Sequence, residues 1–161
     1  MNPKRFYKAF YVVGAALFCV PLLAGTCSAL DVYLAAKAFS KTIVLNGQGA
    51  IAAVPMWGFA QDADGDLSTD GGETPTVPGP AITVSAADPI LNIHLRNDLS
   101  EPVSVVIPGQ AVGLAPVRLA DGRVRSFTYE TAPGSIGTYT WSIRPGTYLY
   151  QSGRASCRER V

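Results

Sequence analysis

The feature that most constrains the fold is the stretch from residue 76 to residue 97, TVPGPAITVSAADPILNIHLRN, in which two extended runs are separated by turn residues. In the second run, residues 90–96, apolar and polar side chains alternate along the chain. A period of two is typical of a strand with one face on a core and the other in water. Proline fixes φ and glycine permits positive φ, so Pro-Gly-Pro at 78–80 and Ala-Asp-Pro at 87–89 mark turns before the two runs.

Turn residues recur about every 8–12 residues through the rest of the chain, which is typical of a β-sandwich or a barrel. The alanines of the first candidate strand also permit a helix, but its β-branched and aromatic residues and the lack of a capping residue favour a strand. Pro55 restricts the second candidate to an edge or a bend of a sheet. The predicted strands are Asp31–Ile43, Ala50–Ala60, Ala81–Val84, Ile90–Arg96, Val103–Ile107, Val117–Leu119, Val124–Tyr129, Tyr139–Ile143 and Thr147–Tyr150.

Residues 1–29 have the pattern of a secretory signal peptide. Basic residues near the start precede an apolar run from Ala9 to Ala24, and small residues at 25–29 provide a cleavage site. The apolar run is shorter than the ~20 residues that a membrane-spanning helix needs. An uncleaved anchor and a lipoprotein attached through Cys27 are the alternatives. We therefore expect a signal helix before the domain and an exported product that is periplasmic, bound to the cell surface or secreted.

Residues 153–161, GRASCRERV, are charged and patternless and follow a clear strand. The codons GGA AGA GCG TCG TGT AGG GAA AGA GTG, which read as a short-read sequencing adapter, encode this tail in order. We therefore interpret the tail as a sequencing-adapter scar and predict that the domain, residues 30–152, is truncated. The alternative is a genuine basic tail.

Setting aside residues 1–29 and residues 153–161 changes the composition of the part that is expected to fold. The three cysteines lie at positions 19, 27 and 157, so residues 30–152 can hold neither a disulfide nor a thiolate metal ligand. The same range has seven Lys/Arg and eleven Asp/Glu, a net charge of −4, whereas the whole chain has +1. A mildly acidic domain argues against nucleic-acid binding. No membrane partner is expected beyond the signal peptide.

Residues 61–74, QDADGDLSTDGGET, form an acidic loop whose carboxylates match the first, third, fifth, ninth and twelfth positions of a calcium-binding loop. The matching residues are Asp62, Asp64, Asp66, Asp70 and Glu73. Clustered carboxylate oxygens suit a hard cation. However, such loops need glycine at the sixth position, which is Leu67 here, and no helices flank the loop. A calcium site and a solvated surface loop are both open interpretations.

Five short motifs occur in order between residues 31 and 152. They are PGPxI from Pro78, LRNxL from Leu95, PVS from Pro102, SFTY from Ser126 and GTYxY from Gly146. With this order and spacing the chain resembles the first cupredoxin domain of multicopper oxidases, the laccase-like family. The resemblance implies a Greek-key β-sandwich, which agrees with the strand pattern. It also implies a further strand after the last motif, so we expect a sandwich that lacks its last strand.

The resemblance implies copper ligands at positions where this sequence has none. The family's His-Trp-His-Gly motif falls on residues 106–109, and its later His-Ser-His motif falls on residues 151–153. The implied ligand positions that precede the predicted scar are occupied by Val106, Pro108 and Gln151. Valine and proline offer no side-chain donor, and an amide is a poor copper ligand beside imidazole. We predict no cofactor in this fragment, whereas copper is expected for the full-length family.

The remaining side chains do not suggest a catalytic site. The only histidine, His94, is expected on the polar face of a strand, and one imidazole does not make a metal site. A blue-copper site would also need a cysteine and a second histidine. Ser104, Ser126 and Ser152 have no histidine placed to activate them. We therefore predict no catalytic residue in this chain.

Two functions are compatible with these observations. The first is the N-terminal, copper-ligand-free cupredoxin domain of an exported multicopper-oxidase-type protein. It would have a structural role, and the downstream cupredoxin domains of the same chain would be its partners and carry any copper oxidase chemistry. The second is a non-enzymatic extracytoplasmic binding module, braced by calcium through Asp62–Glu73. Histidine-rich motifs and a His-Cys-His cluster beyond residue 152 would favour the first function.

Overall fold

The computed structural model describes residues 28–45, 50–68, 73–111 and 114–153, and within these ranges the chain forms strands and no helix. The strands are β1 (Ala29–Leu45), β2 (Ala50–Gln61), β3 (Ile90–Asn97), β4 (Val105–Val106), β5 (Val117–Arg118), β6 (Val124–Ser126), β7 (Ile136–Ser142) and β8 (Gln151–Ser152). The predicted all-β class is confirmed. No helix in the described part of the chain could cross a membrane. The predicted signal segment up to residue 27 and the tail from residue 154 lie outside the described residues.

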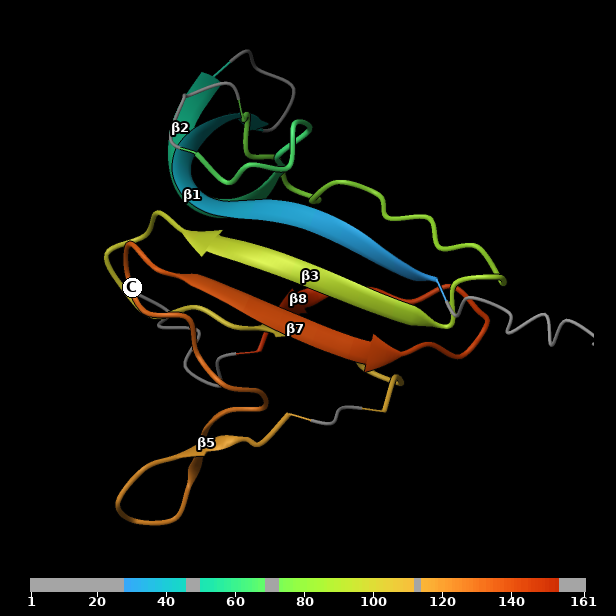
Figure 1. Cartoon of the computed structure of the whole chain (residues 1–161). Helices are drawn as coiled ribbons and strands as arrows, with labels where there is room; N and C mark the ends of the chain where they lie inside the picture. Colours follow the sequence, from blue (N-terminus) through green and yellow to red (C-terminus); the bar gives the residue numbers. More distant parts are fainter. Residues whose placement is uncertain (1–27, 46–49, 69–72, 112–113, 154–161) are drawn as a thin grey trace, which may run out of the picture.

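A four-stranded sheet in the order β2-β1-β3-β7 forms the larger layer (Figure 1). β1 runs antiparallel to β2 and parallel to β3, and β3 runs antiparallel to β7. The long β1 pairs with β3 along its first half and with β2 along its second half. β2 is an edge strand, which is where Pro55 can be accommodated without breaking the ladder on both sides.

The core lies between this sheet and a smaller layer in which β4 pairs antiparallel with β8. Figure 1 shows β8 behind β3 and β7. Alternation along β3 directs Leu91, Ile93 and Leu95 into the core, and β7 adds the buried rings of Tyr139 and Trp141. The segment around β4 contributes Val103, Val105 and Ile107. Two strand layers over one apolar core form a β-sandwich of the cupredoxin-like kind.

Two of the predicted strands are wrong. Residues 81–84 are not a strand in the structure, and residues 147–150 precede the strand β8 instead of forming it. A strand requires hydrogen bonds to a neighbour, and no backbone–backbone hydrogen bond joins residues 81–84 or 147–149 to any other described residue. β-Branched residues make a segment suitable for a sheet, but they do not supply the partner.

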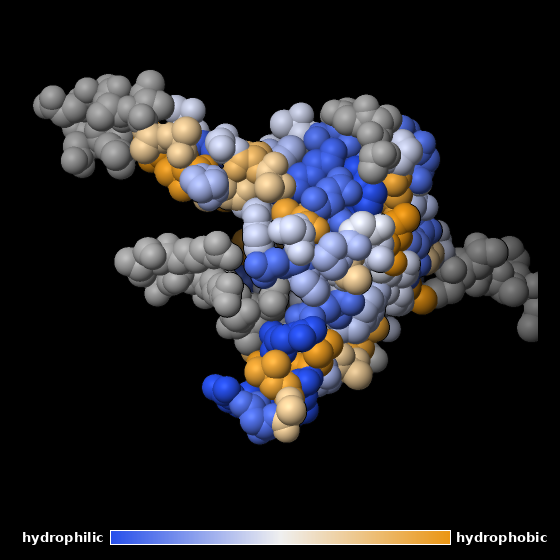
Figure 2. All heavy atoms as spheres, turned by 90° about the vertical axis from the view of Figure 1, so that its left-hand side faces the viewer, coloured by the Kyte–Doolittle hydropathy of each residue, from blue (hydrophilic) through white to orange (hydrophobic). Residues whose placement is uncertain are grey.

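The predicted hairpin around Asp121-Gly122 is confirmed in a shorter form, since β5 and β6 pair antiparallel and Gly122 has a φ of 84°. The surface in the view of Figure 2 is largely hydrophilic, and hydrophobic residues gather mainly on its projecting parts. Large apolar side chains exposed over more than a third of their surface, among the described residues, are Ile43, Val44, Trp57, Leu119, Phe127, Ile136, Tyr148 and Leu149.

Candidate functional site

The fold brings together two segments that are far apart in the sequence and that carry the positions where the resemblance implies copper ligands. β4 and β8 are antiparallel, and Val106 is the pairing partner of Gln151. Alternation along β4 turns Val105 and Ile107 into the core and Val106 to the opposite side. Pro108 follows β4 and is exposed. Val106 and Gln151 therefore lie side by side in the smaller layer, as a shared ligand site would require.

A buried cluster of hydroxyl groups lies beside this pair. The hydroxyl oxygens of Ser104 and Ser126 are 2.7 Å apart, and the Thr128 hydroxyl donates to a backbone carbonyl of β4 at 2.9 Å. All three residues are 0% exposed. The amide of Gly153 donates to the Ser104 carbonyl at 3.2 Å, and the amide that follows β6 donates to the Gly153 carbonyl at 3.0 Å. The end of β8 is thereby bonded to the segments of both β4 and β6.

Gly153 occupies a place in this cluster where a side chain does not fit. A Cβ at residue 153 would lie 2.8 Å from the Ser104 hydroxyl oxygen and 3.3 Å from the Val106 Cβ. A larger residue there would require the Ser104 hydroxyl or β8 itself to move. Gly153 is the first residue of the predicted adapter scar, and it is buried and hydrogen-bonded. The origin of residues 153–161 stays a prediction.

The donor groups at this place do not fit a copper ion. Val106 and Pro108 have no side-chain lone pair, and Gln151 offers only an amide, whereas copper in proteins prefers imidazole and sulfur ligands. The buried hydroxyls are already hydrogen-bonded to one another and to the backbone. No copper chemistry can be derived from this set of residues.

His94 lies on the other side of the sandwich from Val106 and Gln151. Its neighbours on β3, Ile93 and Leu95, face the core, so its ring lies on the outer face of the larger sheet. There its Nε2 is 2.9 Å from Asp31 Oδ1, its Nδ1 is 3.0 Å from the Thr138 hydroxyl, and its ring stacks on Tyr33. The hydrogen bond from His94 lowers the pKa of Asp31. The expectation of a histidine on the polar face of a strand agrees with this placement.

The acidic loop brings three of its predicted ligands together. One carboxylate oxygen from each of Asp62, Asp64 and Asp66 lies within 4.8 Å of the other two. Asp62 is 3% exposed, and its Oδ2 has no hydrogen-bond partner in the described part of the chain, although Arg96 Nη1 is 4.0 Å away. The hydrogen bond with Asp62 raises the pKa of Asp64, and the charge of Asp66 adds to this effect. Leu67 takes a φ of 53°, the left-handed conformation for which such loops normally use glycine.

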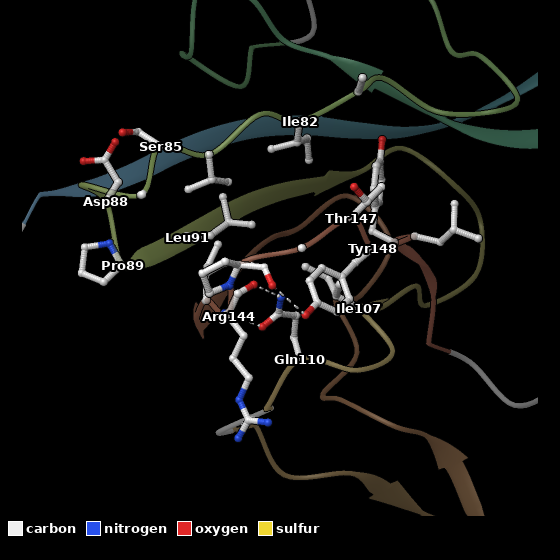
Figure 3. Close-up of a pocket in the computed structure, with 18 of the residues that line it drawn as sticks. Ile82, Ser85, Asp88, Pro89, Leu91, Ile107, Gln110, Arg144, Thr147 and Tyr148 are labelled. Carbon is white, nitrogen blue, oxygen red and sulfur yellow. Dashed lines mark hydrogen bonds between the residues drawn. The ribbon is translucent and has the colours of Figure 1, made fainter.

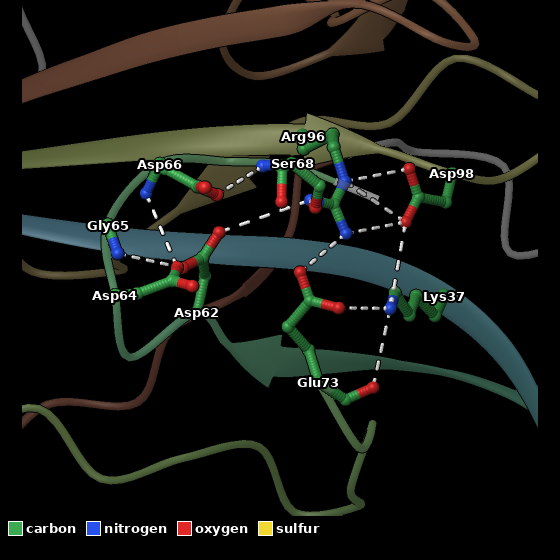
Figure 4. A network of polar contacts seen from close by, with 9 residues as sticks. All are labelled: Lys37, Asp62, Asp64, Gly65, Asp66, Ser68, Glu73, Arg96 and Asp98. Carbon is green, nitrogen blue, oxygen red and sulfur yellow. Dashed lines mark hydrogen bonds and ion pairs between the residues drawn. The ribbon is translucent and has the colours of Figure 1, made fainter. Parts of the chain in front are cut away.

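Glu73 is not part of that cluster, because both of its carboxylate oxygens bind cations elsewhere (Figure 4). Oε2 lies 2.6 Å from Lys37 Nζ, and Oε1 lies 2.7 Å from Arg96 Nη2. The hydrogen bond from Lys37, followed by the interactions with Arg96, lowers the pKa of Glu73 to about 2. Asp70, the remaining predicted ligand, lies outside the described residues.

Arg96 is the centre of a polar network that sequence reasoning missed. Its side chain is 5% exposed, donates to both carboxylate oxygens of Asp98 at 3.0 and 3.2 Å, and also donates to the carbonyl of Ser68. Figure 4 shows how the network joins β3 to the acidic loop and to Lys37 on β1. An arginine inside a strand pattern was the available signal, since a buried cation requires carboxylate partners.

The comparisons with known proteins agree with the resemblance described above. The profile of a family described as multicopper oxidase matches residues 73–160. Among solved structures, a multi-copper oxidase from Pseudomonas thermotolerans superposes with a TM-score of 0.46 at 20% sequence identity. The superposition covers 80% of this chain and 26% of that one, so the chain spans about a quarter of the length of that structure. No curated protein matches the chain.

The family match covers more than half of the chain, and it includes β4, β8 and the segments that pack around them. It also runs into residues 154–160, which lie outside the described residues. The chain belongs to the multicopper oxidase family.

Proposed function

We propose that this chain is the N-terminal, copper-ligand-free cupredoxin domain of an exported multicopper-oxidase-type protein. Its role is structural: it packs against downstream cupredoxin domains of the same polypeptide, and those domains bind the copper and carry any oxidase activity. The family match supports this proposal. In this proposal the chain itself supplies no catalytic residue.

One observation carries the proposal. Val106 and Gln151 are paired neighbours on β4 and β8, so the two ligand-bearing segments are assembled while neither residue is a copper ligand. A fold that brings these two segments together without side chains that bind copper fits a domain that packs against other domains better than a domain that holds a metal. The hydroxyl cluster around Ser104 supports the same view, because hydrogen bonds beside it join β8 to its neighbours.

The full-length gene provides the test. Its sequence beyond residue 152 is expected to encode histidine-rich motifs and a His-Cys-His cluster. The purified full-length protein is expected to contain copper by elemental analysis and to consume oxygen. A reading frame that ends without such motifs, or a full-length protein that holds no copper, would overturn the proposal.

Export belongs to the same proposal. A host that secretes proteins is expected to cleave the chain after Ala29, so Edman sequencing of the exported product should begin at Leu30. A product that keeps residues 1–29 and stays with the membrane fraction would indicate an anchor instead.

A second candidate function is the extracytoplasmic binding module braced by calcium. The carboxylates of Asp62, Asp64 and Asp66 lie close together, and Asp62 Oδ2 is buried without a hydrogen bond. Leu67 supplies the left-handed turn despite its side chain. Asp62, Asp64 and Asp66 would be the ligands, and Glu73 would not, since Lys37 and Arg96 engage its oxygens.

Calcium binding is tested by thermal unfolding with excess calcium chloride and with a chelator. A ligand that binds only the folded state raises Tm as its concentration exceeds Kd, so calcium should raise the Tm of the chain and not of the variant Asp64→Asn. Asp121→Asn, which removes an exposed carboxylate from the β5–β6 turn, serves as the matched control and should keep the calcium response. Equal Tm values with and without calcium would leave the loop as a solvated surface loop.

A further inference from the structure

A buried carboxylate oxygen of the acidic loop has no hydrogen bond. Among buried side-chain atoms in the described ranges, Asp62 Oδ2 and Trp141 Nε1 lack a hydrogen-bond partner. By contrast, the amide of Gln110 at the apolar groove of Figure 3 donates to the Arg144 carbonyl and accepts from the Arg144 amide. A buried carboxylate is costly unless a cation lies close to it, and residues 61–74 contain no lysine or arginine. The cation that Asp62 requires must therefore come from outside the loop.

Arg96 supplies that cation from β3. Its Nη1 lies 4.0 Å from Asp62 Oδ2 and also donates to the Ser68 carbonyl, and its Nη2 donates to Glu73 Oε1 at 2.7 Å. Figure 4 shows the guanidinium with Asp98 on one side and the loop residues on the other. The side chains of Asp62, Glu73 and Arg96 are only 1%, 6% and 5% exposed, so these contacts are shielded from water.

The three oxygens that face Arg96 are oxygens that a calcium loop of this spacing would turn toward its ion. Counted from Asp62 as the first position, Ser68 is the seventh and Glu73 is the twelfth. Calcium loops bind through a carboxylate at the first position, a backbone carbonyl at the seventh and a glutamate at the twelfth. We call Asp62 Oδ2, the Ser68 carbonyl oxygen and Glu73 Oε1 the three-oxygen site.

Asp98 fixes the guanidinium in this orientation. Its two carboxylate oxygens accept from Nε and from Nη2 of Arg96, each at 3.0 Å, and it lies outside the acidic loop, directly after β3. Because the guanidinium is planar and rigid, this two-point contact leaves Nη1 turned toward the loop. A lysine has a single nitrogen and no planar fork, so it could not hold Asp98 and the three-oxygen site in the same arrangement.

We propose that Arg96 is the resident cation of the three-oxygen site, and that it determines how tightly the acidic loop binds calcium. Guanidinium and calcium need the same oxygens, so the two cations exclude each other there. Arg96 belongs to the same chain and therefore competes at a high effective concentration. With Arg96 in place, calcium is left with the clustered carboxylates of Asp62, Asp64 and Asp66. The inference rests on the second candidate function and deepens it, because it names the residue that sets the calcium affinity.

The test compares calcium binding by the 161-residue chain and by the variant Arg96→Met. Terbium, a hard cation of similar size, is the luminescent probe, and Tyr33 is placed to sensitise it, because a Cβ on Gly65 would lie 3.2 Å from the Tyr33 ring. Displacement of terbium by calcium gives the Kd for calcium. Loss of the guanidinium frees the three oxygens and removes a positive charge, so Arg96→Met should bind calcium about tenfold more tightly or better. Equal Kd values for the two proteins would overturn the inference.

Arg123→Met is the matched control for the change in net charge. It removes an arginine whose side chain is 79% exposed and paired with Asp121 in the β5–β6 turn, so the calcium affinity should stay that of the parent. A tightening as large as that of Arg96→Met would show that net charge, and not the three-oxygen site, governs binding, and the inference would be wrong.

Glu73→Gln separates a role as calcium ligand from a structural role. In the Arg96→Met background it should weaken calcium binding about tenfold, because Glu73 Oε1 is then free to bind the ion. In the parent the effect should be far smaller, because Arg96 holds that oxygen. Equal weakening in both backgrounds would show that Arg96 does not occupy the site.

Arg96→Lys keeps the inference testable if Arg96→Met does not fold. The lysine variant retains a buried positive charge but cannot reproduce the fork, so it should fold and bind calcium more tightly than the parent. Folding of Arg96→Met only when calcium is present would also support the inference, because the ion would then replace the guanidinium. Calcium affinity no higher than that of the parent in Arg96→Lys, when Arg96→Met cannot be measured, overturns the inference.

The candidate function and this inference can fail separately. Calcium binding by the parent tests the calcium-braced module, whereas the difference between the parent and the Arg96 variants tests the role of Arg96. Binding by a variant but not by the parent would refute the brace and support the inference. Equal binding by all of them would do the reverse, and binding by none would overturn both.

Discussion

Arg96 and Glu73 illustrate how single residues hold the acidic loop against the sandwich. Arg96 comes from β3, in the middle of the larger sheet, and Glu73 lies near the end of the acidic loop. Their side chains are 5% and 6% exposed, so the pair is shielded from solvent screening. The loop is therefore fixed by a buried ion pair.

The variant Glu73→Gln is expected to lower the free energy of unfolding by about 2 kcal/mol at pH 7, because Lys37 and Arg96 each lose one carboxylate partner. The pKa of Glu73 is lowered to about 2 from an ordinary value of 4.5. Its contribution is therefore complete above pH 4.5 and is lost as the pH falls toward 2. Urea unfolding across this range should show the difference between the two proteins shrinking with acidity.

The exposed pair Asp121–Arg123 provides the control for that series. Its side chains are 48% and 79% exposed, so Asp121→Asn should change stability by less than about 0.5 kcal/mol at any pH in the range. A Glu73→Gln variant as stable as the parent at pH 7 would show that the ion pair does not hold the loop.

The contact between Gly153 and Ser104 gives a second prediction at the residue scale. Gly153→Ala is expected to destabilise the chain by about 1–3 kcal/mol, because its Cβ would lie 2.8 Å from the Ser104 hydroxyl oxygen. Ser104→Ala removes that oxygen, so the double variant should be more stable than the sum of the single effects predicts. Thermal unfolding of the four proteins measures this coupling, and simple additivity would contradict the packing described here.

At the scale of elements, β7 approaches the segment 129–131 so closely that only glycine is accommodated at residue 137. A Cβ there would overlap the Thr131 hydroxyl oxygen, which is itself 2.8 Å from the buried Tyr139 hydroxyl. The rings of Tyr129 and Tyr139 stack over this contact with centroids 4.4 Å apart. This contact packs β7 against the segment 129–131 of the smaller layer.

Gly137→Ala should therefore destabilise the chain by about 2 kcal/mol or more, since overpacking forces the buried hydroxyls or the strand to move. Ser142→Ala, at the exposed end of the same strand, is the matched control and should change stability by less than about 0.5 kcal/mol. Denaturant unfolding followed by tryptophan fluorescence reports on both, because Trp141 lies in the core. Equal stability of the two variants would contradict a close approach at Gly137.

Sequence alone predicted the elements whose pattern reflects a single buried face. The alternation of residues 90–96 predicted β3, and Pro55 predicted the edge position of β2. It could not predict that residues 81–84 stay unpaired, because pairing depends on a neighbour that the described chain does not provide. The sequence also predicted Glu73 as a calcium ligand. The spacing of the carboxylates along the chain does not reveal that the buried side chain of Arg96 binds Glu73.

At the scale of the whole molecule, the chain forms the two layers of its family, and Val106 and Gln151 pair at positions where the resemblance implies copper ligands. The two segments of the ligand positions meet because β4 and β8 close the smaller layer, and that closure depends on hydrogen bonds and packing. A histidine-poor sequence can therefore fold into this frame. The resemblance of motifs predicted the ligand positions, but only the structure places Gly153 against Ser104.

Copper stoichiometry of the purified 161-residue chain is the measurement that decides whether this frame is free of its metal. After incubation with copper(II) and gel filtration, elemental analysis and electron paramagnetic resonance should find copper well below one ion per chain, and Tm should be the same with copper and with a chelator. One tightly bound copper ion per chain, lost when Gln151 is replaced by alanine, would contradict the absence of a copper site between β4 and β8.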